Sequence, residues 1–333
     1  MMRQITRFLR VMSLWMLVCV ATVSAADQAY NPLEVSNSFR AEHVDFDVKD
    51  AKRNRTIPIR VYLPAAKEAA PVVLFSHGLG GSREGNPYLG KHWSARGYVV
   101  VFLQHPGSDD SVWKEIPIGQ RLASMKQAAN LQNTLLRFKD VSAVIDQLEQ
   151  WNQSNDSSLK GRLNLKHLGM SGHSFGAVTT QGVSGQRTPR GDALFTDKRI
   201  QAALAMSPNS PRNGGDPSQL FGGVTIPWLL MTGTNDTAII GDADVASRLA
   251  VFPALPTGGK YELVLEGAEH EAFGDRDLPG TKSKRNPNHH RVILAISTAF
   301  WDAYLREDPA ARKWLDGTGP STVLEPKDRW QSK

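Results

Sequence analysis

The chain has 333 residues and a formal net charge of +6, a length that allows one large domain or two small ones with a sizeable core. Residues 1–26 carry three arginines and no acidic residue, so their removal lowers the charge to +3, which is too mild to indicate a nucleic-acid partner. The only cysteine, Cys19, lies in the same segment, so the mature chain is expected to contain no disulfide and no thiol site.

The first 26 residues have the pattern of a secretory signal peptide. Three arginines precede an apolar run over residues 11–20, and small residues suited to cleavage follow at 23–26. The run is shorter than the ~20 residues that a spanning helix needs, which disfavours an uncleaved anchor. We therefore expect a secreted or periplasmic protein without a stable membrane anchor, in which residues 27–333 form a single domain.

The mature chain begins with two stretches of alternating apolar residues, 44–48 and 57–63, which predict an antiparallel hairpin at a sheet edge, where Pro58 is tolerated. Continuous apolar runs then alternate with segments of helical periodicity. These predict strands at 71–77, 98–103, 163–170, 200–206, 226–232 and 261–265, and helices at 88–96, 131–151, 177–181 and 288–305. Such alternation is typical of an α/β fold, a mostly parallel twisted sheet with helices on both faces.

Two polar segments, 106–130 and 207–225, follow predicted strands. Open α/β sheets bind their ligands beyond the carboxyl ends of strands, so both segments are candidates for the rim of a site. The first is expected to contain a short helix and includes the apolar residues Val112, Trp113, Ile116 and Ile118. It could form an apolar wall or partial lid, or be an ordinary surface excursion, and the sequence leaves both open.

Gly172-His173-Ser174-Phe175-Gly176 lies between a predicted strand and a predicted helix. A Gly-x-Ser-x-Gly pattern at such a turn is a nucleophile elbow, in which the serine backbone is strained and its hydroxyl is exposed. The turn is so sharp that the residues two before and two after the serine must lack bulk. Ser174 is therefore the candidate nucleophile, and His173 is expected to pack beneath the elbow.

Asp236 lies in a tight turn just past the strand at 226–232, and His270 lies in the loop past the strand at 261–265. In this type of fold the acid and then the base follow the serine in sequence, which makes Asp236 and His270 the candidate acid and base. All three residues would then lie at strand ends on the same rim as Ser174. An aspartate after a strand is often only a turn former or helix cap.

Rival residues are less consistent with this order. Asp242 and Asp244 are expected to cap the helix that follows them. His105 follows a strand but precedes the serine. His289 and His290 lie in the basic run 282–291, which we interpret as a solvated face.

The first long parallel strand ends in Gly78-Leu79-Gly80-Gly81, where hydrolases of this fold place an oxyanion loop. The backbone N–H groups of Leu79 and Phe175 could converge on a developing oxyanion. A phosphate-binding loop is disfavoured because no Gly-Lys-Ser/Thr or G-x-G-x-x-G pattern is present. Asp275 and Asp277 lack the remaining ligands of a calcium site, so no metal and no cofactor is expected.

These motifs resemble the α/β-hydrolase superfamily. More narrowly, the segments at 73–80, 96–100 and 172–176 look like those of the predicted dienelactone-hydrolase branch that includes secreted platelet-activating-factor acetylhydrolases. The resemblance spans roughly residues 70–305 and implies an α/β-hydrolase fold with Leu79 and Phe175 as oxyanion donors. The acetylhydrolases carry their acid after the strand that corresponds to 200–206. Residues 207–210 here include no acid, so the acid is expected at Asp236.

Together these features predict an exported serine hydrolase that cleaves carboxylic esters, with short or medium acyl chains favoured because no bulky apolar cap domain is visible. The expected partner is a small-molecule or lipid-like ester, and the oligomeric state is left open. The alternatives are a lipase, phospholipid or polyester hydrolase on the same triad, a peptidase or acyltransferase, and a non-catalytic binding protein of this fold.

Overall fold

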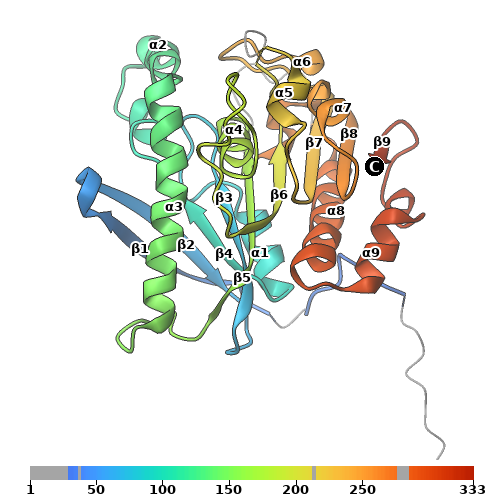
Figure 1. The fold of residues 1–333 in the computed structure, drawn as a ribbon, viewed down its shortest axis with the longest axis horizontal. Helices are drawn as coiled ribbons and strands as arrows, with labels where there is room; N and C mark the ends of the chain where they lie inside the picture. Colours follow the sequence, from blue (N-terminus) through green and yellow to red (C-terminus); the bar gives the residue numbers. More distant parts are fainter. Residues whose placement is uncertain (1–28, 37–38, 212–214, 276–284) are drawn as a thin grey trace, which may run out of the picture. The chain divides into compact units, whose positions relative to one another are not determined.

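A computed structural model of the chain describes residues 29–36, 39–211, 215–275 and 285–333 (Figure 1). The chain divides after Tyr30, and the second unit, Asn31–Lys333, is compact. The expected signal peptide, residues 1–26, lies outside the described residues, so it stays a prediction. The second unit contains all the elements discussed below.

One sheet of nine strands organises the described part of this unit, in the spatial order β1-β2-β4-β3-β5-β6-β7-β8-β9. Strands β3 to β8 pair in parallel, whereas β1, β2 and β9 pair antiparallel at the two edges. The strands are β1 (Glu42–Asp50), β2 (Arg55–Leu63), β3 (Ala70–Ser76), β4 (Val99–Leu103), β5 (Leu163–His173), β6 (Ile200–Met206), β7 (Trp228–Asn235), β8 (Lys260–Glu269) and β9 (Arg329–Ser332).

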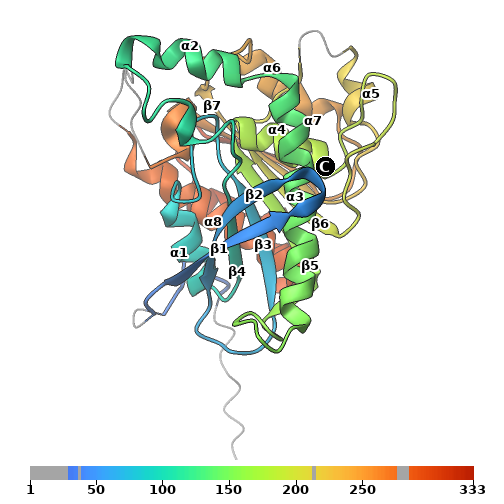
Figure 2. The same cartoon turned by 90° about the vertical axis from the view of Figure 1, so that its left-hand side faces the viewer.

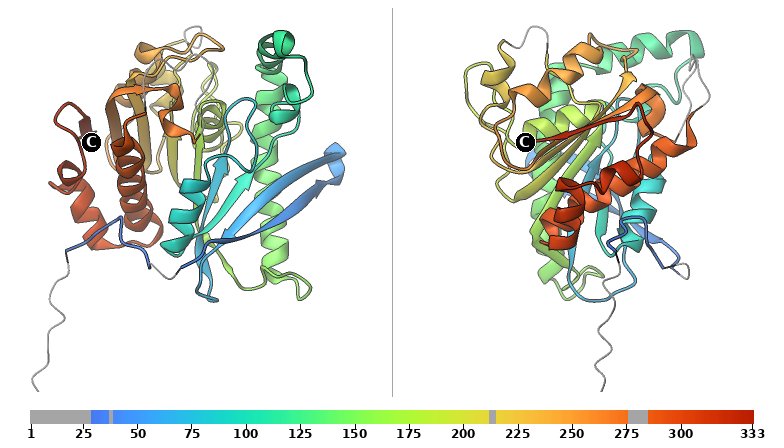
Figure 3. Two further views of the ribbon diagram at one scale, coloured as in Figure 1. Left: turned by 180° about the vertical axis from the view of Figure 1, so that it is seen from behind. Right: turned by 90° about the vertical axis from the view of Figure 1, so that its right-hand side faces the viewer.

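Helices cover both faces of this sheet. Helices α3 and α4 lie on one face, and α1 and α8 lie on the other (Figures 1 and 3). The helices are α1 (Pro87–Ala95), α2 (Ile118–Ala128), α3 (Leu131–Gln153), α4 (Phe175–Val183), α5 (Pro217–Phe221), α6 (Val245–Leu249), α7 (Val251–Ala254), α8 (Pro287–Leu305) and α9 (Pro309–Asp316), with short 3-10 turns η1 (Ala51–Arg53), η2 (Asp110–Val112), η3 (His270–Phe273) and η4 (Pro320–Thr322). The predicted α/β-hydrolase architecture is confirmed.

The core follows from this layering. A parallel strand covered on both faces must be apolar at every position, which is why β4 is buried throughout and reads as a continuous run of valine, phenylalanine and leucine. Helix α3 buries one stripe against the sheet, where Val141, Val144, Ile145 and Leu148 are inaccessible to solvent. The same face of α3 also buries Arg137 and Asp140, two charged residues whose partners lie near the site.

The predicted edge hairpin is present as β1 and β2. Pro58 lies on β2, and the pairing of β2 with β4 begins one residue later, at Ile59. The Pro58 carbonyl still accepts a hydrogen bond from the N–H of Gln104 (2.8 Å). Pro58 is thus paired with Asp47 in the β1–β2 register but lies just before the β2–β4 register begins, where a residue without an N–H is tolerated.

Three expectations about the chain after β7 need correction or refinement. Asp244 is the N-cap of α6 and forms a capping box with Ser247, so the capping role belongs to Asp244 rather than to both aspartates. The expectation of a solvated face is wrong for His289, which is only 4% exposed and bonds the Glu266 carbonyl. It is also wrong for His290, whose ring stacks on that of Tyr88 at 4.0 Å.

His289 is buried and His290 is half-buried because the first turn of α8 packs against the end of β8 and against α1. Charge counting along the chain gives no sign of this packing. Asp277 and residues 282–284 of the same basic stretch lie outside the described residues. Within the described ranges, no helix has both the length and the apolar character that crossing a membrane requires.

Candidate active site

Ser174 occupies the turn between β5 and α4 with φ 59° and ψ −117°, a backbone conformation that is strained for any residue but glycine. Two neighbouring glycines make the turn possible. A Cβ atom at Gly172 would lie 2.3 Å from the Gly176 carbonyl oxygen, and one at Gly176 would lie 1.9 Å from the Ser76 carbonyl oxygen. Backbone cannot give way as a side chain can, so both positions require glycine, as the sharpness of the elbow predicted.

The structure brings the three predicted side chains into one hydrogen-bonded chain. The Ser174 hydroxyl lies 2.8 Å from Nε2 of His270, and Nδ1 of His270 lies 2.7 Å from Oδ1 of Asp236. Asp236 is inaccessible to solvent, and its second oxygen accepts a hydrogen bond from Thr232 (2.9 Å). Each of the three residues follows its own strand, β5, β7 or β8, so the carboxyl edge of the sheet assembles them.

The geometry assigns the protons. Because Asp236 can only accept, Nδ1 of His270 carries the hydrogen and Nε2 is left to accept from the serine hydroxyl. Burial alone would raise the pKa of Asp236, but the hydrogen bond from His270 and the charge of Arg248 lower it to about 2. The acid is therefore ionised at neutral pH.

His173, the residue before the serine, packs beneath the elbow as expected. Its ring lies 4.7 Å from that of His270, and its Nε2–H donates to the His270 backbone carbonyl (3.0 Å). Burial, with the neighbouring His270, lowers the pKa of His173 to about 3. His173 therefore stays neutral and holds η3 in place rather than competing as a base.

The loop after β3 lies against the serine: a Cβ atom on Gly78 would touch Cβ of Ser174 at 3.4 Å. Among the described residues, neither the Leu79 N–H nor the Phe175 N–H donates to a protein acceptor. Two unpaired amides beside a nucleophile are the usual donors to a tetrahedral oxyanion. The predicted pair Leu79 and Phe175 thus has the required freedom to bind a ligand oxygen.

Comparison with known proteins agrees with this architecture. Residues 50–114 match the family model described as platelet-activating factor acetylhydrolase, isoform II. The match runs from the end of β1 to just past η2, so it includes the loop that carries Leu79. The chain has the α/β-hydrolase fold. The resemblance drawn from its sequence is confirmed over that range, and no curated protein matches the chain.

Sequence reasoning missed Arg248, which lies on α6 and is 1% exposed. Its Nε is 2.9 Å from Oδ1 of Asp236 and donates to the Asp236 carbonyl (2.7 Å), and its Nη2 is 3.2 Å from Nδ1 of His270. Its Nη1 donates to the carbonyls of Ser207 (2.8 Å) and Pro208 (3.1 Å). One guanidinium therefore contacts the candidate acid and the candidate base.

Sequence reasoning also missed Arg137, a fully buried residue on α3. Its Nη1 donates to the His77 carbonyl (2.7 Å), its Nε donates to the Ser108 hydroxyl (2.8 Å), and its guanidinium lies 4.2 Å from the Phe175 ring centre. Burial lowers the pKa of Arg137 to about 9, so it remains charged at neutral pH. One cation thus contacts both the loop after β3 and the residue that follows Ser174 in the elbow.

A second Ser-His-Asp array lies beside the loop after β3. Oγ of Ser76 is 3.0 Å from Nε2 of His105, whose Nδ1 is 3.0 Å from Oδ2 of Asp140. All three side chains are inaccessible to solvent, so no substrate can reach them. Arg53 and Arg55 also bind Asp140, which makes this array a structural anchor for the ends of β3 and β4.

The segment 106–130 packs on the oxyanion loop. Trp113 donates through Nε1 to the Gly80 carbonyl (2.7 Å), and the Gly80 N–H donates to Ser108 (2.9 Å). The expected short helix is present as α2, which carries Ile118 (84% exposed) and Leu122 (48% exposed). Figures 1 and 2 place α2 and α6 at the same end of the sheet, so α2 stands at the end that carries the site.

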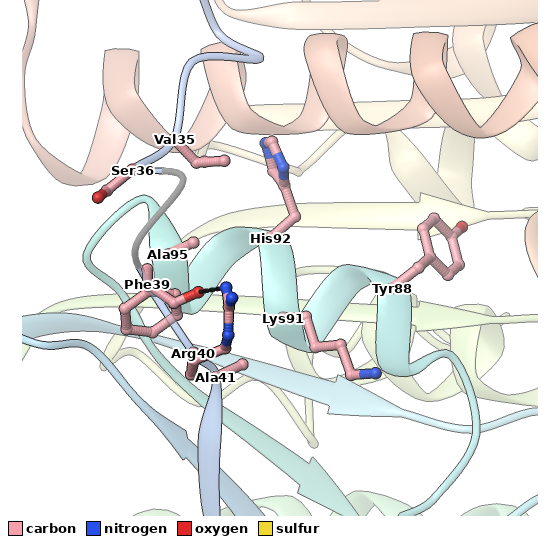
Figure 4. A pocket seen from close by; sticks show the side chains of 9 residues that line it. All are labelled: Val35, Ser36, Phe39, Arg40, Ala41, Tyr88, Lys91, His92 and Ala95. Carbon is pink, nitrogen blue, oxygen red and sulfur yellow. Dashed lines mark hydrogen bonds between the residues drawn. The ribbon is translucent and has the colours of Figure 1, made fainter.

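The described residues contain no group of three or more His, Cys, Asp or Glu side chains arranged to hold a metal ion. A cavity of about 490 Å³ lies between α1 and the segment before β1 (Figure 4). Tyr88, Lys91 and His92 of α1 line it, and none of the residues of the Ser174 site does. The Ser174, His270 and Asp236 side chains therefore lie outside this cavity.

Proposed function

We propose that this α/β hydrolase is an exported serine esterase in which Ser174 is the nucleophile, His270 the general base and acid, and Asp236 the residue that orients the base. The observation that carries the proposal is the unbroken chain of 2.8 Å and 2.7 Å contacts from serine to aspartate. The strained elbow adds support, because such strain is kept where a nucleophile must be presented. Export rests on the signal-peptide pattern of residues 1–26.

The proposed reaction begins when Nε2 of His270 accepts the Ser174 proton as Oγ attacks the ester carbonyl carbon. The carbonyl oxygen becomes an anion, which the N–H groups of Leu79 and Phe175 stabilise. The C–O bond to the alcohol then breaks, and the imidazolium returns its proton to the leaving oxygen. Water, deprotonated by the same nitrogen, attacks the acyl-enzyme and releases the acid and the free serine.

Short acyl groups are the proposed substrates. The family model matched by residues 50–114 is named for an acetylhydrolase, which supports a small acyl group. A phospholipid or another lipid-like ester is the second candidate. It is favoured by the exposed Ile118 and Leu122 of α2, which would meet an apolar chain at the end of the sheet that carries the site.

A panel of p-nitrophenyl esters of rising acyl length, run on wild type and Ser174→Ala, tests the proposal. We expect hydrolysis that falls with chain length and a loss of several orders of magnitude in kcat for the variant. Ester hydrolysis at the wild-type rate in Ser174→Ala would refute it. An amino-acid p-nitroanilide and an added alcohol acceptor test for peptidase or acyltransferase activity in the same assay.

A fluorophosphonate probe provides the matched control, since the chain has two Ser-His-Asp arrays. Ser174 is partly exposed and should be labelled, whereas Ser76 is inaccessible. Labelling should therefore vanish in Ser174→Ala and persist in Ser76→Ala. Absence of labelling in the folded wild-type protein would instead support a non-catalytic binding protein.

A further inference from the structure

Arg248 has an unusual position for a cation. It is 1% exposed, and Oδ1 of Asp236 lies 2.9 Å from its Nε while the same oxygen lies 2.7 Å from Nδ1 of His270. One carboxylate oxygen is thus shared by a guanidinium and an imidazole. The orienting acid of a triad needs only the imidazole as its partner, so this second cation calls for an explanation of its own.

The contact between Arg248 and His270 is a contact between two donors. Nδ1 of His270 carries a hydrogen that points to Asp236, and Nη2 of Arg248, 3.2 Å away, has only hydrogens to offer. The fixed charge of the guanidinium therefore lies directly beside the imidazole in a buried site.

The same guanidinium also fixes the acid in space. It donates to the Asp236 carbonyl (2.7 Å) and to the carbonyls of Ser207 and Pro208. Ser207 follows β6 and Asp236 follows β7, so Arg248 ties two neighbouring strand ends together. With its Oδ2 bonded to Thr232, the Asp236 carboxylate has little freedom to turn away from His270.

We propose that Arg248 is a positioning residue of the site: it holds Asp236 in line with His270, and its charge beside the imidazole sets the pH range in which the site is active. This inference rests on the proposed roles of Ser174, His270 and Asp236. It adds a regulation of the same site by the charge of a residue that never touches the substrate.

Other titratable groups around His270 do not supply this charge. His173 of β5 is neutral because burial, with the neighbouring His270, lowers its pKa to about 3. The elements packed against η3 carry further titratable or charged side chains. On β8 these are Lys260, Tyr261, Glu262, Glu266 and Glu269, and on α8 they are His289, His290, Arg291, Asp302 and Tyr304. Glu271 lies on η3 itself, and Arg285 donates to the Glu271 carbonyl (3.1 Å). Arg248 contacts the imidazole ring directly, with its Nη2 3.2 Å from Nδ1 of His270.

The test compares variants that keep or remove the charge. Arg248→Lys keeps it, whereas Arg248→Met and Arg248→Gln remove it, and the glutamine retains a donor for the Ser207 carbonyl. We measure kcat/KM for p-nitrophenyl acetate and the rate of fluorophosphonate labelling of Ser174, each from pH 4 to 9. Arg199→Met, which removes an arginine from a surface ion-pair cluster with Asp146 and Asp197, is the control.

Both neutral variants should move the acid limb of both profiles upward by about one pH unit. The lysine variant should have a lower maximal rate, but the midpoint of its acid limb should stay within a few tenths of a pH unit of the wild-type midpoint. Arg199→Met should match wild type in both rate and midpoint. If Arg248 only clamps the Ser207 and Pro208 carbonyls, the neutral variants lose plateau activity with the limb unmoved, which overturns the inference.

The two neutral variants make the test robust to misfolding, which circular dichroism and thermal melting detect, because either one alone decides it. Should neither fold, the labelling profile of wild type against Arg248→Lys decides, since an upward shift of one unit with the charge retained would also overturn the inference. Failure of the proposed function gives a different result. Ser174→Ala would then hydrolyse esters at the wild-type rate, and the role inferred for Arg248 would be refuted together with the proposed function.

Discussion

The guanidinium of Arg137 lies 4.2 Å from the centre of the Phe175 ring while it donates to the backbone carbonyl of His77. Phe175 and the loop after His77 carry the two amides that we propose as oxyanion donors. These donors come from segments about a hundred residues apart in sequence, and one buried cation contacts both. Loss of Arg137 should therefore loosen the oxyanion hole without altering the nucleophile.

We expect Arg137→Lys and Arg137→Met to lower kcat for p-nitrophenyl acetate by about 10- to 100-fold with KM nearly unchanged, since oxyanion contacts form only in the transition state. Affinity for a trifluoromethyl ketone, which forms the tetrahedral oxyanion, should fall in step with kcat/KM. The lysine variant should lose less because it keeps the charge. A rise in KM at constant kcat would contradict this role.

The glycines of the elbow give a second prediction. Gly176→Ala should abolish fluorophosphonate labelling and lower the melting temperature, because its Cβ would lie 1.9 Å from the Ser76 carbonyl oxygen. Gly119→Ala on α2 is the matched control, since nothing lies within 4 Å of an added Cβ there. We expect this control to be neutral or to gain up to about 1 kcal/mol in stability. Normal labelling in Gly176→Ala would show that the turn can relax.

The main strands and helices could be predicted because buried parallel strands and covering helices impose apolar periods that are visible in the residues themselves. The elbow could be predicted for a similar reason, since Gly172 and Gly176 respond to a local steric demand. The short strand β9 and helix α9 could not, because four or eight residues with mixed polarity carry no clear period.

The roles of the two buried arginines could not be predicted from the sequence for another reason. In the sequence, Arg137 and Arg248 look like any charged residue on a helix. Their roles depend on carbonyl groups and rings that only the folded chain brings close to them. Arg137 does lie on the same face of α3 as Val141 and Val144, and a charge within an apolar stripe is a signal that could have found it. Arg248, in a five-residue helix, offers no such signal.

The exposed face of α2 gives a third prediction. Ile118→Ser and Leu122→Ser should leave the melting temperature unchanged, because both side chains are largely in solvent. If α2 borders the acyl site, KM for the decanoate ester should rise several-fold in the double variant, whereas an ordinary surface helix would leave it unchanged. Leu194→Ser, another exposed leucine (70%), which lies between α4 and β6, is the control.

The last prediction concerns acid stability. Burial alone would raise the pKa of Asp140, but hydrogen bonds from His105 and Arg55 lower it to about 2, from 3.8 as an isolated group. A carboxyl whose pKa is depressed by folding stabilises the protein above pH 4 and loses that contribution as the pH falls towards 2. The difference corresponds to roughly 2 kcal/mol at neutral pH.

Asp140→Asn should therefore be less stable than wild type to urea at pH 6, by about 2 kcal/mol or more, because Arg53 and Arg55 also lose their charged partner. The deficit should shrink as the pH is lowered from 5 to 2, where the wild-type carboxyl is itself protonated. Asp146→Asn is the control, since that carboxylate is 62% exposed and its ion pair should contribute little. A deficit that stays constant down to pH 2 would mean that the charge of Asp140 does not stabilise the array beneath the oxyanion loop.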